Sequence, residues 1–143
     1  QLLIALRRSG MSAPRKMSTS LMKQLSHDVV AEVTDFLAEH IGSKVRFAEV
    51  ADFAGMSGSS LKNIFRNQTG QGVMTYFAQM KMDRAKTLIR EGNYNITQIA
   101  ALLGYDSIHQ FSRRFKDITG MSPREYGKSV KVEFDKVLSE YAE

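Results

Sequence analysis

The sequence contains no cysteine, so it can form neither a disulfide bond nor a thiolate metal site. Its three histidines, His27, His40 and His109, are too widely spaced to form a ligand cluster. No glycine-rich phosphate-binding motif is present either. These absences argue against a metal centre, a cofactor and an enzymatic activity.

The sequence also lacks an apolar run near the roughly 20 residues that a membrane span needs. Its first residues do not show the pattern of a secretory signal. Apolar residues make up 43% of the 143 residues, which is enough for one small domain or two very small ones. We expect a globular cytoplasmic protein with no membrane partner.

Acidic residues are unevenly distributed along the chain. Residues 1–24 have five bases and no acid, whereas residues 131–143 have two bases and four acids. The middle zone, residues 25–130, has thirteen bases and eleven acids. The net charge of +5 favours an anionic partner, but the direction in which the bases of the middle zone point matters more than the sum.

The N-terminal 24 residues are predicted to lie outside the main fold. Residues 1–10, QLLIALRRSG, have the composition of the end of a helix, which we interpret as the tail of an upstream domain; a frayed N-terminal arm is the alternative. Residues 11–24 combine Ser, Thr, Pro and bases without periodicity, which is typical of a basic linker.

From residue 25 onward the pattern is helical, with no convincing strand, so the predicted class is all-α. A helix is expected from Ser26 to Gly42, and a single long helix over Val73–Arg90. We divide the chain into a first subdomain (25–71), a linking helix (72–92), a second subdomain (93–130) and a C-terminal acidic helix (131–143).

Each subdomain is predicted to contain a pair of short helices separated by a glycine. In the first pair, Phe47–Ala54 is followed by Gly55 and by a helix capped at Ser57 that ends near Thr69. In the second pair, the caps are Asn95 and Ser107, the breaking glycine is Gly104, and the end is near Thr119. A further helix start follows at Ser122, with Pro123 in the first turn and Glu125 at the third position.

The two pairs are an internal repeat, with an offset of 49 residues for the first helix and 50 for the second. The matched residues are Ala51 with Ala100, Gly55 with Gly104, Leu61 with Phe111, Phe65 with Phe115, Thr69 with Thr119, Gly70 with Gly120 and Tyr76 with Tyr126. The alanine lets two helices cross closely, and the glycine supplies the positive φ of a short turn. Two aligned copies predict two helix-turn-helix units.

The second helix of each unit has an apolar face and a polar face. Leu61, Ile64 and Phe65 point inward in the first unit, and Phe111 and Phe115 in the second. The outward residues contain no acid: Ser59, Lys62, Asn63 and Arg66 in the first unit, and Ile108, His109, Ser112, Arg113 and Lys116 in the second. Bases recognise guanine, Asn recognises adenine, and an apolar group contacts the thymine methyl, so these faces suit the major groove of DNA.

The linking helix bears on the spacing of the two units. Eighteen residues at about 1.5 Å each span roughly 27 Å, which is near the 34 Å or so of one turn of DNA. We expect one chain to read two successive major-groove segments, as a dimer of single helix-turn-helix domains does.

The segment ITQIAALLGYDSIHQFSRRFKDITGMSPREY, residues 96–126, closely resembles the signature of the AraC/XylS transcription regulators. The resemblance covers about Val29–Lys128. It implies a bacterial protein with a bipartite DNA-binding domain, two helix-turn-helix units joined by a helix, and control of promoters, most often activation through RNA polymerase.

The resemblance also implies roles for individual residues. Base contacts fall on Ser59, Lys62, Asn63, Ile108, His109, Ser112 and Arg113. Phosphate contacts are expected for Ser57, Arg66, Lys81, Ser107, Arg114 and Lys116. Lys81 replaces the usual Arg of the family, Gly127 replaces a common base, and Gly58 and Ser59 are small residues at the start of the first recognition helix.

The partners predicted are double-stranded promoter or operator DNA, RNA polymerase, and an upstream N-terminal domain that senses an effector or dimerises. We expect the acidic C-terminal helix to pack on the domain, with a partner-binding helix as the alternative. Two other interpretations stay open: one unit reads bases while the other only grips the backbone, or the chain is a helical protein-interaction module.

Overall fold

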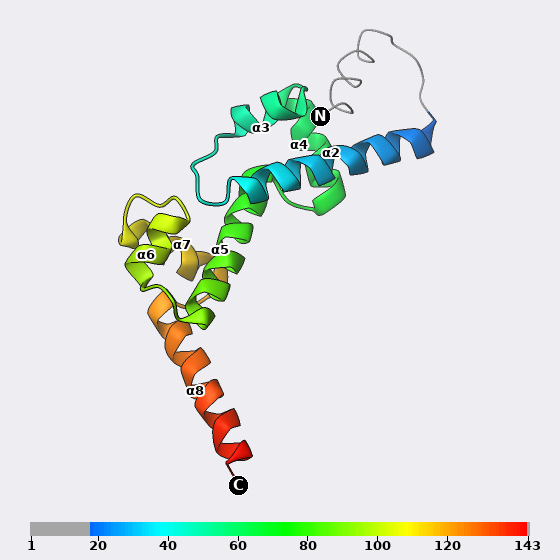
Figure 1. Cartoon of the computed structure of the whole chain (residues 1–143). Helices are drawn as coiled ribbons and strands as arrows, with labels where there is room; N and C mark the ends of the chain where they lie inside the picture. Colours follow the sequence, from blue (N-terminus) through cyan, green and yellow to red (C-terminus); the bar gives the residue numbers. More distant parts are fainter. Residues whose placement is uncertain (1–17, 143) are drawn as a thin grey trace. The chain divides into compact units, whose positions relative to one another are not determined.

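Seven helices form the described part of the chain, residues 18–142 of a computed structural model, and no strand occurs in that range (Figure 1). The predicted all-α class is confirmed. Predictions for residues 1–17 fall outside the described residues. The helices are α2 (Thr19–Glu39), α3 (Phe47–Ala54), α4 (Gly58–Thr69), α5 (Val73–Glu91), α6 (Ile96–Leu102), α7 (Ile108–Thr119) and α8 (Pro123–Tyr141).

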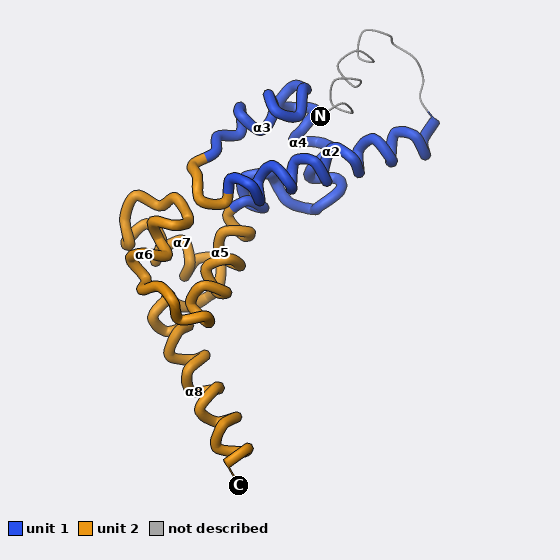
Figure 2. The backbone as a smooth tube through the Cα atoms, in the orientation of Figure 1, with its two compact units in different colours: residues 1–40, 45–77 blue, residues 41–44, 78–143 orange. Residues whose placement is uncertain are grey.

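The chain forms two compact units, and each contains one helix-turn-helix pair (Figure 2). Among the described residues, unit 1 comprises 18–40 and 45–77, with the pair α3 and α4. Unit 2 comprises 41–44 and 78–142, with the pair α6 and α7. Residues 41–44 lie between α2 and α3 in the sequence and yet belong to unit 2.

The predicted helix starts are confirmed by hydrogen bonds of the capping side chains. At each start a side-chain oxygen accepts a hydrogen bond from the backbone N–H three residues later, which satisfies an otherwise unpaired donor. The donors and distances are Ser60 to Ser57 at 3.2 Å, Gln98 to Asn95 at 2.8 Å, Gln110 to Ser107 at 3.2 Å, and Glu125 to Ser122 at 3.1 Å.

The turns inside both helix pairs need glycine, as predicted. Gly55 has a φ of 70° and Gly104 a φ of 81°, in the left-handed region that side chains disfavour. Gly42 is different, because its φ is not positive and α2 already ends at Glu39. Gly42 is therefore not the left-handed end of α2, and its role lies in close packing.

The start of α2 also differs from the prediction. A linker was predicted up to residue 24, but the helix begins at Thr19, and Ser18 caps it by accepting a hydrogen bond from the Leu21 N–H at 3.2 Å. The segment Leu21–Leu25 consists of good helix formers. Leu21 and Met22 are exposed, so the first turn of α2 lacks the apolar periodicity that would have predicted it as a helix packed on the core.

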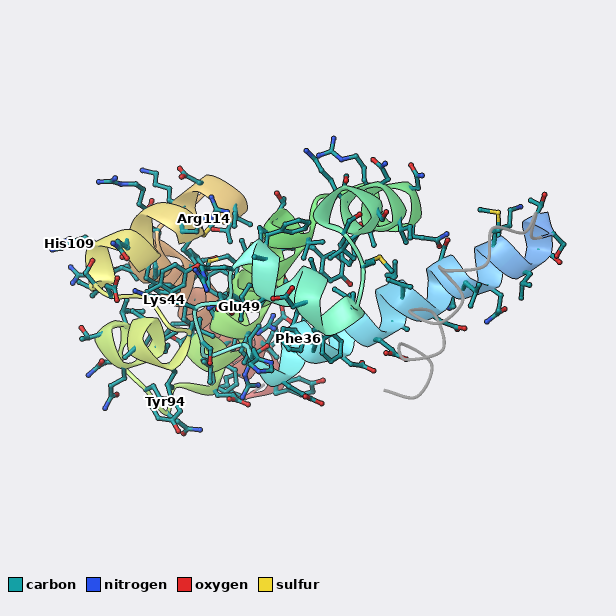
Figure 3. All side chains as sticks on the ribbon, turned by 90° about the horizontal axis from the view of Figure 1, so that it is seen from above. Phe36, Lys44, Glu49, Tyr94, His109 and Arg114 are labelled. Atoms are coloured by element: carbon teal, nitrogen blue, oxygen red, sulfur yellow. The ribbon has the colours of Figure 1, made fainter. Side chains whose placement is uncertain are left out.

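Unit 1 is built on one face of α2, which packs against α3 and α4. Val29, Val33 and Leu37 form its buried stripe. The Phe36 ring lies 4.4 Å from the Phe53 ring of α3, measured between centroids (labelled in Figure 3). Burial of these side chains supplies the driving force of this unit.

Unit 2 is built around the C-terminal part of α5, the pair α6 and α7, and the start of α8. The rings of Phe111 and Phe115 are fully buried and lie 5.8 Å apart, and Tyr126 of α8 lies 5.8 Å from Phe115. The buried cluster consists of Met82, Ala85, Leu88, Ile99, Ala100, Leu103, Phe111 and Phe115.

Lys81 lies inside unit 2, so its predicted contact with phosphate is wrong for this structure. Only 7% of the residue is exposed. Its ammonium donates hydrogen bonds to the carbonyl oxygens of Ser43, at 2.8 Å, and Leu103. It also lies 5.5 Å from the centroid of the Tyr105 ring. Burial lowers the pKa of Lys81 from 10.5 to about 8, since a low-dielectric site disfavours the charge.

The C-terminal half of α8 does not pack on the domain, so the expectation that it does is wrong. Pro123 is buried and Tyr126 and Val130 are half-buried, but every residue from Lys131 to Ala142 is exposed. Phe134 and Tyr141 are 62% and 84% exposed. The helical periodicity of residues 132–141 is confirmed, but these residues continue the helix that starts at Pro123 and do not form a separate one. No other part of the described chain covers their apolar side chains.

Replacing Phe111 with Ala should cost about 3–5 kcal/mol of unfolding free energy, because the ring is fully buried among other core side chains. Urea unfolding followed by circular dichroism measures this loss. Val132→Ala is the matched control, since Val132 is 68% exposed and its loss should change stability by no more than about 0.5 kcal/mol. Equal losses in the two variants would contradict the assigned core.

The buried Lys81 should make stability rise with pH above pH 8. Its pKa is about 8 in the folded chain and 10.5 ordinarily, so the unfolded chain binds more protons between those values. We expect the unfolding free energy of the native chain, minus that of Lys81→Met, to rise through this window by at most about 1.4 kcal/mol per pH unit. Urea unfolding of both proteins across the window measures the difference, and a flat or falling difference would refute the burial of the charge.

Candidate nucleic-acid interface

α4 presents a polar face to solvent on the side opposite its buried residues. Leu61 and Phe65 are fully buried, and the Tyr76 ring packs edge-on against Phe65 with centroids 5.3 Å apart. This packing fixes the rotation of the helix about its axis. The predicted residues Ser59, Lys62, Asn63 and Arg66 are all exposed.

Close packing explains why the first residue of α4, Gly58, is small. A Cβ atom on Gly58 would lie 3.0 Å from the Phe47 ring of α3, which is tighter than nine in ten real Cβ contacts. Glycine therefore lets the first turn of α4 approach α3 closely. Ser59, the next residue, is the first side chain of the helix that is exposed.

α7 has the same plan in unit 2, with three basic residues where α4 has two. Its buried residues are Phe111 and Phe115, whereas Ile108 and Ser112 are half-buried. His109 projects outward from the start of the helix (Figure 3). The bases of α7, Arg113, Arg114 and Lys116, are all exposed.

α4 and α7 are both 12 residues long and end in the same way. The hydroxyl of Thr69 donates to the Phe65 carbonyl at 2.8 Å, and that of Thr119 donates to the Phe115 carbonyl at 2.7 Å. Left-handed glycines, Gly70 and Gly120, follow. The repeated Thr-Gly of the sequence thus ends each helix.

The hydroxyls of Ser57 and Ser107 are engaged in capping the two helices. Ser57 is exposed and Ser107 is half-buried. A helix N-terminus carries partial positive charge and first-turn N–H groups, so these ends suit a phosphate even though the hydroxyls have an intramolecular role.

The electrostatics of the two faces are favourable to an anion. α4 contains no acid, and α7 contains one, Asp117, which is exposed. Within residues 18–142, none of Lys62, Arg66 and Arg113 forms an ion pair with an acid. Their charges are consequently not neutralised by the protein.

Bases of α7 contribute to the pKa shifts of Tyr105 and Glu125, although they are not the largest cause of either shift. Burial raises the pKa of Tyr105, and the nearby charge of Arg114 opposes that rise. The pKa of Glu125 is lowered, first by the backbone and side-chain hydrogen bonds with Ser122 and further by Lys116 and Lys128. Arg114 thus acts on Tyr105, and Lys116 and Lys128 act on Glu125.

The predicted base-contacting residues fall into two sets, one on α4 in unit 1 and one on α7 in unit 2. Whether they contact bases stays a prediction. Asn67, which was not among the predicted residues, is also exposed and lies one helical turn beyond Asn63 on α4. The four-residue spacing from Asn63 is the signal that would have identified it.

In residues 18–142, no helix has the length and apolar character of a membrane span. The same residues contain no group of three or more histidine or acidic side chains arranged to bind a metal ion.

Comparison with known proteins finds a family model described as a helix-turn-helix domain over residues 50–129, more than half of the chain. The probable transcriptional regulator LumQ of Photobacterium leiognathi is 31% identical over 94 residues, covering 66% of this chain and 38% of LumQ. The transcriptional activator RhaR of Yersinia pseudotuberculosis is 33% identical over 90 residues, covering 63% of this chain and 31% of RhaR. The chain thus spans about a third of the length of these relatives.

Solved structures share the fold. The DNA-binding domain of AdpA, in complex with a target DNA, superposes with a TM-score of 0.69 at 23% identity, covering 73% of this chain and 94% of that one. A regulator from Chromobacterium violaceum with an AraC-type DNA-binding domain gives a TM-score of 0.68 at 22% identity, again covering 73% and 94%. With its two helix-turn-helix pairs, its matching family model and these relatives, the chain belongs to the AraC/XylS family of DNA-binding transcription regulators.

Proposed function

We propose that the chain reads duplex DNA with both recognition helices, α4 and α7, in two successive segments of the major groove. The observation that supports this most is the shared design of the two helices. α4 buries a Leu and a Phe, and α7 buries two Phe side chains. Each helix exposes bases and hydrogen-bonding groups on the opposite face. An α-helix of this kind fits the major groove, where each base pair has a distinct pattern of donors and acceptors.

Roles for individual side chains follow from their chemistry. Arg113 and Lys62 suit the O6 and N7 acceptors of guanine, and Asn63 suits the N6 and N7 groups of adenine. His109 and the Ser59 and Ser112 hydroxyls can donate to or accept from base edges, and the half-buried Ile108 suits a thymine methyl.

Phosphate contacts are proposed for the exposed bases at the edges of the two faces and for the helix starts. They position the protein on the duplex without reading sequence. The residues are Arg66 on α4, Arg114 and Lys116 on α7, and the N-terminal turns that begin after Ser57 and Ser107. Lys81 is not among them, because it is buried.

At the level of the whole protein, we propose that it regulates promoters, as an activator that contacts RNA polymerase and responds through an N-terminal effector or dimerisation domain. The description of RhaR as a transcriptional activator supports the proposal that this protein activates promoters. The cytoplasm, at the nucleoid, is the compartment where such a protein would act.

Selection of bound duplexes from random DNA by residues 1–143 tests the proposed function. The expected result is a consensus with two conserved blocks, one for each recognition helix. Enrichment of a single block would mean that only one unit reads bases. Absence of any salt-dependent DNA affinity would favour a protein-interaction module instead.

Arg113→Ala should relax specificity at one base pair of the selected site by about 1–3 kcal/mol, because Arg113 is exposed, unpaired and able to bind guanine bidentately. Binding of the selected duplex and of its single-base variants, compared for native and variant chains, measures the change. An equal loss on specific and random DNA would rule out base reading by Arg113.

Lys116→Ala should weaken binding to all duplexes alike, because an ammonium on phosphate does not read sequence. The slope of log affinity against log salt should become shallower by about 0.9, the value for one lost phosphate contact. Titrations at several salt concentrations measure it, with Lys136→Ala on the far part of α8 as the matched control. A change of base preference in Lys116→Ala would contradict the phosphate role.

A further inference from the structure

We propose that the loop Ile41–Lys44, called the brace below, positions α7 for reading DNA, an inference that rests on the function proposed above. In the sequence the brace is a connection between two helices of unit 1, α2 and α3. In the structure it belongs to unit 2. Each of its four residues contacts unit 2 through a different kind of interaction.

The central interaction is a backbone-to-backbone contact with the second helix-turn-helix pair. A Cβ atom on Gly42 would lie 2.6 Å from the Leu102 carbonyl oxygen of α6, a separation that real Cβ atoms essentially never show. A Cβ atom on Gly104 would in turn lie 2.9 Å from the Gly42 carbonyl oxygen. The brace and the α6–α7 turn therefore approach more closely than any side chain at these two positions would allow.

Lys81 holds the two segments together by polar bonds. Its ammonium donates to the Ser43 carbonyl oxygen of the brace at 2.8 Å and to the carbonyl oxygen of Leu103, just after α6. Hydrogen bonds from a charged donor are stronger than those between neutral groups, and removing the donor leaves two carbonyl groups without this partner. A single buried side chain of α5 therefore connects the brace to the end of α6.

The two ends of the brace complete the attachment. Ile41 packs against the buried cluster of unit 2. Lys44 forms an ion pair with Asp106 in the α6–α7 turn (Lys44 is labelled in Figure 3). Both partners of this pair are more than half exposed, so it contributes less than the backbone contact and the Lys81 bonds.

These contacts converge on the turn that sets the direction of α7. The brace and Lys81 touch Leu103, Gly104 and Asp106, and α7 begins at Ile108, with His109 next. Residues that recognise a ligand must be held to within about 0.5 Å by the elements behind them. A turn that loses the brace would let α7 tilt and would blur its base preference without removing any DNA-contacting group.

Gly42→Ala, compared with Gly72→Ala, tests the brace in the 143-residue chain. Neither glycine has a positive φ, so alanine strains neither backbone. The nearest atom to a Cβ on Gly72 is Nη2 of Arg66, at 3.9 Å, which is an ordinary contact. Both variants replace glycine with alanine, but only the alanine at position 42 would clash with the Leu102 carbonyl oxygen.

The first readout is hydrogen exchange in the absence of DNA. The Gly104 N–H donates to the Ala101 carbonyl oxygen at 3.1 Å, and the Tyr105 N–H to that of Ala100 at 3.0 Å. We expect Gly42→Ala to speed the exchange of both amides by about tenfold or more, since the turn opens more easily. Gly72→Ala should leave both rates unchanged.

The second readout is base preference in DNA selected from random duplexes. Arg113→Ala identifies the block that α7 reads. Gly42→Ala should flatten the preference within that block and leave the other block unchanged. Gly72→Ala should retain both blocks.

Lys81→Met and Lys81→Arg provide an independent test without a steric clash. Met removes the ammonium donor, whereas Arg keeps N–H donors at this position on a longer side chain with a planar guanidinium. We expect Met to reproduce both effects of Gly42→Ala and Arg to reverse them at least in part. If Gly42→Ala does not fold, this pair decides the question.

The outcomes separate the two proposals. Native exchange rates in folded Gly42→Ala and Lys81→Met, or an equal loss of preference in both blocks, would overturn the brace. A native chain without base preference would instead overturn the proposed function, while the exchange rates would still report on the brace.

Discussion

Burial of a narrow apolar face holds the second helix of each pair, through Leu61 and Phe65 in α4 and through Phe111 and Phe115 in α7. A helix of 12 residues has little else to fix its rotation, so these side chains also decide which residues face outward. Each buried aromatic ring is worth about 3–5 kcal/mol on truncation, a large share of the stability of a small unit. The polar face available to DNA is therefore a consequence of the aromatic face opposite to it.

Much of the fold could be predicted because its signals are local. The caps at Ser57, Asn95 and Ser107 and the left-handed turns at Gly55 and Gly104 each depend on residues within one helical turn. The outward residues of α4 and α7 followed from periodicity as well, and all of them are exposed except Ile108 and Ser112, which are half-buried. Contact with DNA is a different matter, since it depends on a partner that neither periodicity nor the fold of the free chain includes.

The predictions that differ from the structure concern residues whose environment is decided by contacts between distant parts of the sequence. Lysine is usually a surface residue, but the ammonium of Lys81 bonds to Ser43 and Leu103, which are 38 and 22 residues away in the sequence. Gly42 was interpreted as a helix end because a glycine after an apolar stripe usually is one, whereas its role is a close approach to Leu102. In α8, periodicity identified the side that a neighbour would cover, but it carries no information on whether that neighbour exists in the chain.

The ends of α4 and α7 are built by hydrogen bonds that leave out the exposed residues in the middle of each helix. At the N-terminus a serine hydroxyl caps the helix, and at the C-terminus a threonine hydroxyl and a left-handed glycine close it. Residues such as Asn63 and Arg113 take no part in these hydrogen bonds. The outward face of each helix can accordingly change in sequence without disturbing the bonds that start and end that helix.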